Sequence, residues 1–262
     1  MTAAANVWAL VRKEWRHYFG SPIAYVVLAV WTALFGSFFY SAVYFFLRRS
    51  MMAGQMEMGG APKMSLNEWV ISPVLHNMAV VVLFVAPMLT MRLFAEEKRQ
   101  GTLELLGTAP LTNLQLVLGK FLAAAGLYLA MILAGLINLG FLWYYASTRP
   151  EWKPVLTAAL GLFLFGCCFL ALGTFVSTLT RNQIIAAIVS FCLFLLLWIL
   201  DWAADPTASA FWRAVSELAV TKHLEDMVKG VLALKDVVFY LSFIAFGLFL
   251  AHQSVESQRW RA

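Results

Sequence analysis

The sequence predicts an all-α polytopic membrane protein, with six transmembrane helices and an N-terminal amphipathic helix at the membrane interface. Of its 262 residues, 62% are hydrophobic and only 13% are charged, against about 25% charged residues in a typical soluble domain. The hydrophobic residues gather in long runs, and aromatic residues, which anchor chains at both membrane interfaces, make up 15% of the chain. This composition excludes a disordered chain and argues against a soluble enzyme, because a globule of this size cannot hide so much apolar surface from water.

Six apolar runs are the expected transmembrane helices: residues 23–47, 70–91, 116–146, 155–179, 184–200 and 237–251. A helix needs about 20 apolar residues to cross the hydrocarbon core of a bilayer. Helices are expected because the runs are unbroken, whereas the strands of a barrel would alternate in polarity. The last run is short, so it needs Asp236 and His252 at the interfaces to reach across. No stretch is long and polar enough for a second domain, so residues 1–262 are predicted to form a single transmembrane domain.

The N-terminal segment, residues 1–22, is predicted to be an amphipathic helix that lies in the membrane interface. Its apolar residues recur at helical spacing, while Arg12, Lys13 and Arg16 fall on the opposite face and meet the lipid headgroups. Glu14 falls on the apolar face and does not fit this pattern. Ser21-Pro22 then ends the helix and redirects the chain into the first crossing.

The polar segment 92–115 has internal structure of its own. A charged turn is expected to lead to Gly101, and a short amphipathic helix to follow it with Thr102 as the N-cap. Thr112 and Gln115 form a possible capping box at the start of the third membrane helix. A short helix held between two membrane helices suits docking into a groove of a partner. The alternative is a plain solvated loop.

The sequence lacks the motifs and residues that are expected for several classes of function. No Asp, Glu, Lys or Arg lies deep inside the six runs, although ion-coupled carriers usually keep such residues at mid-membrane. The HExxH and GxSxG motifs of metalloproteases and serine hydrolases are missing, so the chain is not expected to be an enzyme. The phosphate-binding motif GxxxxGK[ST] is also missing, so we expect no ATP or other cofactor to be bound by this chain.

The segment APMLTMRLFAEEKRQGTLELL at residues 86–106, followed by Ala109-Pro110 and Gly119-Lys120, resembles ABC-2 type permeases. The resemblance is closest to the gliding-motility (Gld-type) ABC permease subunits and the related nitrous-oxide-reductase maturation permeases. Residues 10–25 resemble the N-terminal connecting helix of this family, and residues 230–242 and 256–261 resemble its last crossing and its tail.

This resemblance implies a permease subunit with six membrane helices that works as a pair, with a second permease copy or a homologous permease and two copies of an ABC ATPase. ATP and Mg would be bound by the ATPase. In the family, the loop after the second helix docks on the ATPase. The resemblance therefore implies that this loop and both termini lie in the cytoplasm, and that the protein lies in the inner membrane of a bacterium. The implied coupling residues are Glu96, Glu97, Gly101, Thr102, Leu103, Glu104, Leu105 and Leu106. Export of the substrate is implied by the same analogy.

Other functional features stay open in the sequence. Polar candidates for a substrate path are Thr32, Ser37, Tyr40, Asn77 and Ser190. The first outer loop is rich in methionine, which suits a soft metal such as Cu(I) or an adaptable apolar surface; we favour the second and expect no metal site. The outer segment 201–236 is expected to form interfacial helices. The net charge of +5 is attributed to contact with anionic lipid and not to nucleic acid. Alternative functions are an ATPase-independent carrier or channel, and a membrane anchor of a larger assembly.

Overall fold

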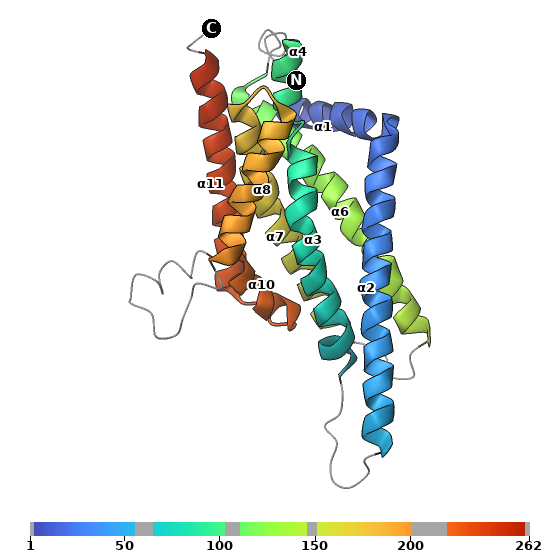
Figure 1. Cartoon of the computed structure of the whole chain (residues 1–262). Coiled ribbons are helices and arrows are strands. Elements are labelled where there is room, and N and C mark those ends of the chain that lie inside the picture. Colours follow the sequence, from blue (N-terminus) through green and yellow to red (C-terminus); the bar gives the residue numbers. More distant parts are fainter. Residues whose placement is uncertain (1–2, 56–64, 103–110, 146–150, 201–218, 260–262) are drawn as a thin grey trace.

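The computed structural model describes residues 3–55, 65–102, 111–145, 151–200 and 219–259. In these residues all regular elements are helical, so the predicted all-helical membrane fold is confirmed. Six helices run along the bundle (Figure 1): α2 (Pro22–Gln55), α3 (Ser72–Thr90), α6 (Asn113–Tyr145), α7 (Trp152–Leu179), α8 (Gln183–Ile199) and α11 (Leu234–Arg259). The shorter elements are α1 (Ala3–Gly20), the π-helix η1 (Asn67–Ile71), α4 (Ala95–Gln100) and α10 (Val220–Val228).

Five helical stretches in the described residues are long and apolar enough to cross a membrane: Ala24–Met52, Asn67–Gln100, Asn113–Tyr144, Trp152–Leu179 and Leu234–Gln258. The sixth bundle helix, α8, is apolar but has only 17 residues. The last crossing is longer than the apolar run 237–251, because polar residues continue α11 to Arg259. Near this end the Gln258 amide donates a hydrogen bond to the Thr178 carbonyl at 2.9 Å, which gives the polar extension a partner inside the protein. The apolar run thus lies inside a longer helix that also contains Asp236 and His252.

The helix α7 forms the centre of the bundle. Of its most apolar 18-residue stretch, 72% is buried within the protein, against 11% for α2. Glycines let its neighbours approach closely: a Cβ atom added at Gly173 would lie 2.3 Å from the Thr90 hydroxyl of α3, and one at Gly166 would overlap the ring of Tyr128 on α6. The Tyr128 hydroxyl then donates to the Leu162 carbonyl of α7 at 2.7 Å. The interior is thus built around α7, while α2 leaves most of its surface to lipid or to another chain.

The interfacial helix α1 lies crosswise at one end of the bundle (Figure 1) and docks against α6. The Trp15 indole donates to the Ala123 carbonyl at 3.0 Å. The same indole ring packs directly against Gly126, where a side chain would leave no room for it: a Cβ atom added there would lie 2.5 Å from Trp15. Leu10 and Val11 are buried in this contact, whereas Trp8 stays exposed for the membrane interface. The amphipathic helix is therefore fixed to the bundle through its apolar face.

At the opposite end of the bundle, the short helix α10 lies within the segment 201–236, for which interfacial helices are expected. It packs against α7 and α11. The His223 ring lies 2.7 Å from the Asp236 carboxylate, which is only 1% exposed, and the Tyr240 hydroxyl donates to the Val220 carbonyl at 2.9 Å. The rest of the expected outer segment, residues 201–218, lies outside the described residues.

Candidate coupling site

The expected charged turn before Gly101 is wrong, because Ala95–Gln100 forms the short helix α4. Its acidic residues stand in the first turn and its basic residues in the last turn, an order that stabilises a helix through its dipole. Gly101 ends α4 with a φ of 71°, a backbone conformation that favours glycine. The expected cap, Thr102, is itself helical, and its hydroxyl donates to the Glu97 carbonyl at 3.4 Å. The helix predicted to follow, with Leu103, Glu104, Leu105 and Leu106, lies outside the described residues.

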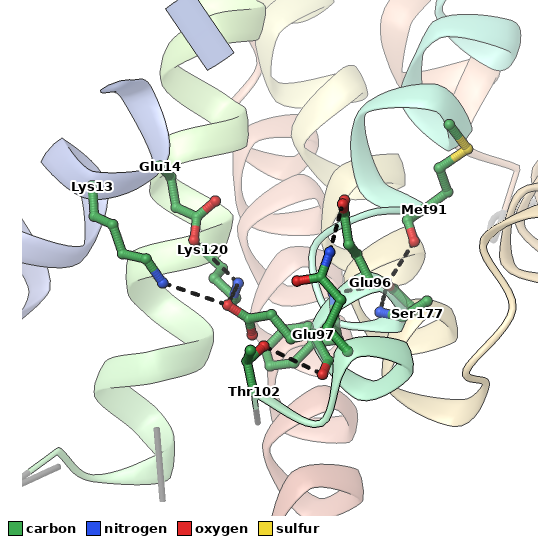
Figure 2. Close-up of polar contacts among 11 residues, drawn as sticks. Lys13, Glu14, Met91, Glu96, Glu97, Thr102, Lys120 and Ser177 are labelled. Atoms are coloured by element: carbon green, nitrogen blue, oxygen red, sulfur yellow. Dashed lines mark hydrogen bonds and ion pairs between the residues drawn. The ribbon is translucent and has the colours of Figure 1, made fainter. Parts of the chain in front are cut away.

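A network of buried charges joins α4 to two other helices (Figure 2). The ammonium group of Lys120 on α6 lies 2.8 Å from Glu97 of α4 and 3.2 Å from Glu14 of α1. This lysine is only 2% exposed, and its ammonium also lies 5.3 Å from the centre of the Phe94 ring. Lys13 approaches Glu97 from the solvent side at 3.7 Å. Two carboxylates and two ammonium groups therefore hold three elements together.

This network explains why Glu14 stands on the apolar face of the N-terminal helix. A buried carboxylate is costly unless a cation pairs with it, and Lys120 provides that cation from a position 106 residues away. The sequence shows that Glu14 stands on an apolar face, but it does not show that Lys120 is its partner. Lys120, Glu14 and Ser177 were thus missed as site residues, and the only sequence signal was a lone acidic residue among apolar ones.

The start of α4 is bound to the end of α7. The Ser177 hydroxyl accepts hydrogen bonds from the backbone N–H groups of Phe94 and Ala95 at 3.1 and 3.2 Å, and donates to the Met91 carbonyl at 3.2 Å. Ser177 thereby satisfies the free N–H groups that a helix without a capping side chain leaves at its N-terminus. The Lys98 ammonium donates to the Thr178 carbonyl on the same helix.

The predicted capping box at the start of α6 is confirmed. The Thr112 N–H donates to the Gln115 side chain, and the Gln115 N–H donates to the Thr112 hydroxyl, both at 3.2 Å. The Asn6 amide of α1 reaches the same Gln115 side chain at 3.4 Å. The first turn of α6 is therefore fixed at the end of the bundle that carries α1 and α4.

The described coupling residues differ in their surroundings. Glu97 is central to the charge network, whereas the Glu96 carboxylate accepts a hydrogen bond from Gln100 at 3.3 Å within α4. Gly101 and Thr102 shape the end of α4 as stated above. The outer methionines Met56, Met58 and Met64 lie outside the described residues.

The five candidates for a substrate path are not joined to one another by any hydrogen bond in the described part of the chain. The hydroxyls of Thr32 and Ser37 donate to carbonyls of their own helix α2 at 2.8 Å. Tyr40 and Asn77 are exposed on α2 and α3, and Ser190 is buried on α8. The structure therefore gives no support for a common path through these side chains.

A comparison with known protein families assigns the chain to one of them. The sequence profile of the ABC-2 family transporter proteins matches residues 8–229, which include most of α1, all of α4 and the charge network. The chain belongs to the ABC-2 transporter family. It is thus a membrane protein and a transmembrane component of an ABC transporter, and such ABC-2 permeases generally work with an ABC ATPase. A search among curated proteins finds no significant match.

Proposed function

We propose that this ABC-2 permease is driven by a separate ABC ATPase that docks on residues 96–106. The observation that supports this proposal is the attachment of α4 to three helices at once: Glu97 pairs with Lys13 of α1 and Lys120 of α6, and Ser177 binds the start of α4 to α7. A segment fixed in this way cannot move without moving its neighbours. It is therefore suited to transmit a displacement that arises outside the membrane.

In the proposed mechanism, closure of two ATPase copies on ATP pulls the coupling segments of two permeases together. The buried ion pairs turn a push on α4 into a shift of α1 and α6, because separating them would leave charges unpaired in a poorly solvated place. The shift moves the bundle between states with different access to the two sides of the membrane. ATP and Mg are bound by the ATPase alone in this scheme.

The proposed orientation places α4 and both termini in the cytoplasm and the protein in a bacterial inner membrane. The start of α1 and the end of α11 lie at the same end of the bundle as α4 (Figure 1), which supports this arrangement. The sequence resemblance supports three further parts of the proposal. The transporter is an exporter, it belongs to the Gld-type subfamily, and the chain pairs with a second permease copy or a homologous permease.

Co-purification tests the docking. The tagged permease is expressed together with ABC ATPase subunits from the same organism, and the bound ATPase is quantified together with ATP hydrolysis in liposomes. Glu104→Arg combined with Leu105→Ala is expected to release the ATPase, whereas Glu225→Gln on the outer helix α10 is the matched control and is expected to retain it. Undiminished ATPase binding by the double variant contradicts the proposed docking segment.

The alternatives are tested by the permease alone. An ATPase-independent carrier or channel moves its substrate in liposomes without any hydrolysing subunit, and a membrane anchor shows no transport with or without one. Substrate-stimulated ATP hydrolysis in the reconstituted complex supports the proposal against both alternatives.

A further inference from the structure

An aromatic strip, formed by Trp8, Trp15 and Phe19, runs along one side of α1. The three residues recur at spacings of seven and four positions, which places them on the same side of a helix. The rings of Trp8 and Trp15 lie 6.4 Å apart, and the ring of Phe19 lies 5.9 Å from that of Tyr25 on α2. All four rings are exposed in the described part of the chain. An exposed apolar surface of this kind marks a contact with another molecule or with a membrane.

The contacts of α1 show that the aromatic strip faces the bilayer. Glu14 pairs with Lys120 near the start of α6. The next residue, Trp15, packs instead against Gly126, which lies about 9 Å further along α6 in the direction of the opposite end of the bundle. The other end of the strip meets the first turns of α2. Since α2 and α6 both enter the membrane from this end, the rings point towards the lipid, where aromatic side chains sit at the level of the headgroups.

Two arginines stand beside the aromatic strip. Arg12 and Arg16 are four residues apart, and Arg12 is four residues from Trp8, so the three are neighbours on the helix surface. Both arginines are exposed, and neither has a hydrogen bond or an ion pair with any residue that the structure describes. Lys13 differs from them, because it pairs with Glu97 on the side of α4. Of the three basic residues expected at the headgroups, Arg12 and Arg16 thus keep their charges free for a ligand.

The charge around these arginines favours an anionic ligand. Glu14 is the only acidic residue of α1. It is buried against the bundle and paired with Lys120, so no carboxylate of this helix stands on the arginine side to repel an anion. Guanidinium groups bind phosphate oxygens through two parallel hydrogen bonds. Two unpaired guanidinium groups also favour a lipid with a net negative charge over a zwitterionic one.

We propose that Arg12, Arg16 and the aromatic strip form a binding surface for anionic phospholipids of the phosphatidylglycerol type. The guanidinium groups bind the phosphates of the headgroups, and the rings enter the layer between the headgroups and the acyl chains. The strip favours a lipid over a soluble phosphate, because a soluble ligand leaves the rings exposed to water. The assignment to the cytoplasmic leaflet rests on the proposed function, whereas the preference for an anionic lipid does not.

The proposed lipid surface is connected to the coupling site through the charge network. Lys13 and Glu14 stand between the two arginines in the sequence and bind α4 and α6, respectively. Lipids that hold the arginines in the headgroup layer therefore also fix the helix to which α4 is attached. Bound anionic lipid is expected to raise the stability of the permease, as does any ligand that binds only the folded form.

The test measures lipid retention by the full-length permease without any ATPase. The protein is purified in detergent, exchanged into micelles with equal amounts of palmitoyl-oleoyl phosphatidylglycerol, phosphatidylethanolamine and phosphatidylcholine, and examined by native mass spectrometry. Wild-type protein is expected to retain phosphatidylglycerol about thirtyfold over each zwitterionic lipid, with about fivefold from each arginine. Added salt is expected to lower this preference, because both arginines are exposed.

Matched variants assign the preference to the two arginines. Arg12→Gln and Arg16→Gln are each expected to lower it about fivefold and to leave the melting temperature in lipid-free detergent unchanged, because neither side chain has a partner to lose. Arg12→Lys combined with Arg16→Lys keeps both charges and is expected to keep most of the preference. Arg181→Gln is the control, because Arg181 is exposed at the same end of the bundle but lies between α7 and α8. It is expected to retain phosphatidylglycerol as the wild type does.

Equal retention of the three lipids by the wild-type protein overturns the proposal. So does a wild-type preference in the double variant Arg12→Gln, Arg16→Gln, or a loss in Arg181→Gln as large as in the single variants. Displacement of phosphatidylglycerol by millimolar soluble glycerophosphate overturns the lipid assignment in favour of a soluble phosphate. These readouts need no ATPase, so they are independent of whether residues 96–106 dock one.

Discussion

Lys120 is the residue on which the attachment of α4 depends, because its ammonium group pairs with carboxylates from two other helices. We predict that Lys120→Met lowers the free energy of unfolding by about 3–5 kcal/mol, since it leaves the buried Glu14 carboxylate unpaired and leaves Glu97 with only the exposed Lys13, at 3.7 Å. Fluorescence-detected size-exclusion chromatography after heating measures the loss.

The control for this prediction removes the charges together. In the triple variant Glu14→Gln, Glu97→Gln, Lys120→Met, no buried charge remains among the three residues, so most of the lost stability is expected to return. Coupled ATP hydrolysis is expected to stay low, because the ionic attachment of α4 is gone. A Lys120→Met protein as stable as the wild type contradicts the proposed role of the network.

The buried His223–Asp236 contact at the other end of the bundle permits a comparison between a buried hydrogen bond and an exposed ion pair. His223→Ala leaves the Asp236 carboxylate, which is 1% exposed, without the ring 2.7 Å away, and we predict a loss of several kcal/mol, on the order of 3. Lys229→Gln breaks the exposed Lys229–Glu225 pair and is expected to cost less than about 1 kcal/mol. Thermal unfolding of the two variants, side by side, checks the difference. Equal losses of stability would show that the His223–Asp236 pair contributes no more than the exposed Lys229–Glu225 pair.

At the scale of elements, the docking of α1 depends on a glycine. A Cβ atom at Gly126 would lie 2.5 Å from Trp15, whereas one at Gly140 on the same helix meets nothing within 4 Å. We predict that Gly126→Ala destabilises the α1–α6 contact by about 1–3 kcal/mol through overpacking, while Gly140→Ala is neutral or slightly stabilising. Accessibility of a cysteine placed at Leu10, which is buried in this contact, reports the undocking. Equal labelling in both backgrounds argues against a packing role for Gly126.

The elements differ in how far the sequence predicts them. The apolar runs identify the membrane helices because lipid forces an unbroken apolar segment to satisfy its own backbone hydrogen bonds as a helix. The capping box at Thr112 and Gln115 was readable because its two partners are three residues apart. Helix α4 is not predicted because four of its six residues are charged and show no apolar spacing, and because its first N–H groups are bound by Ser177, a residue more than 80 positions away.

The site was predictable only in part for the same reason. Glu97 and Gly101 follow from the family resemblance, but the pairing of Glu14 with Lys120 joins residues 106 positions apart. No local spacing contains that information. The sequence shows an acidic residue in the wrong place, and only the packing of α1 on α6 shows why it is there.

For the whole molecule, the orientation in the membrane can be tested directly. Gln100 is exposed at the end of α4, and Leu232 is exposed near the opposite end of the bundle. We predict that Gln100→Cys reacts with a membrane-impermeant maleimide only after the inner membrane is opened, whereas Leu232→Cys reacts in spheroplasts with an intact membrane. The reverse pattern would invert the proposed topology. Because Cys192 is also exposed, it is replaced by serine in both variants.

The shared ammonium of Lys120 has a consequence for engineering. Glu14, Glu97 and Lys120 come from three separate stretches of the chain. Replacing only residues 92–111 with the segment of another permease therefore changes the surroundings of Glu97 without changing Glu14 and Lys120, with which it forms the network. A chimera intended to accept a foreign ATPase should therefore transplant the interfacial helix and the first turns of α6 along with the loop. Recombination between related transporters faces the same restriction, so these three stretches are expected to be inherited as one module.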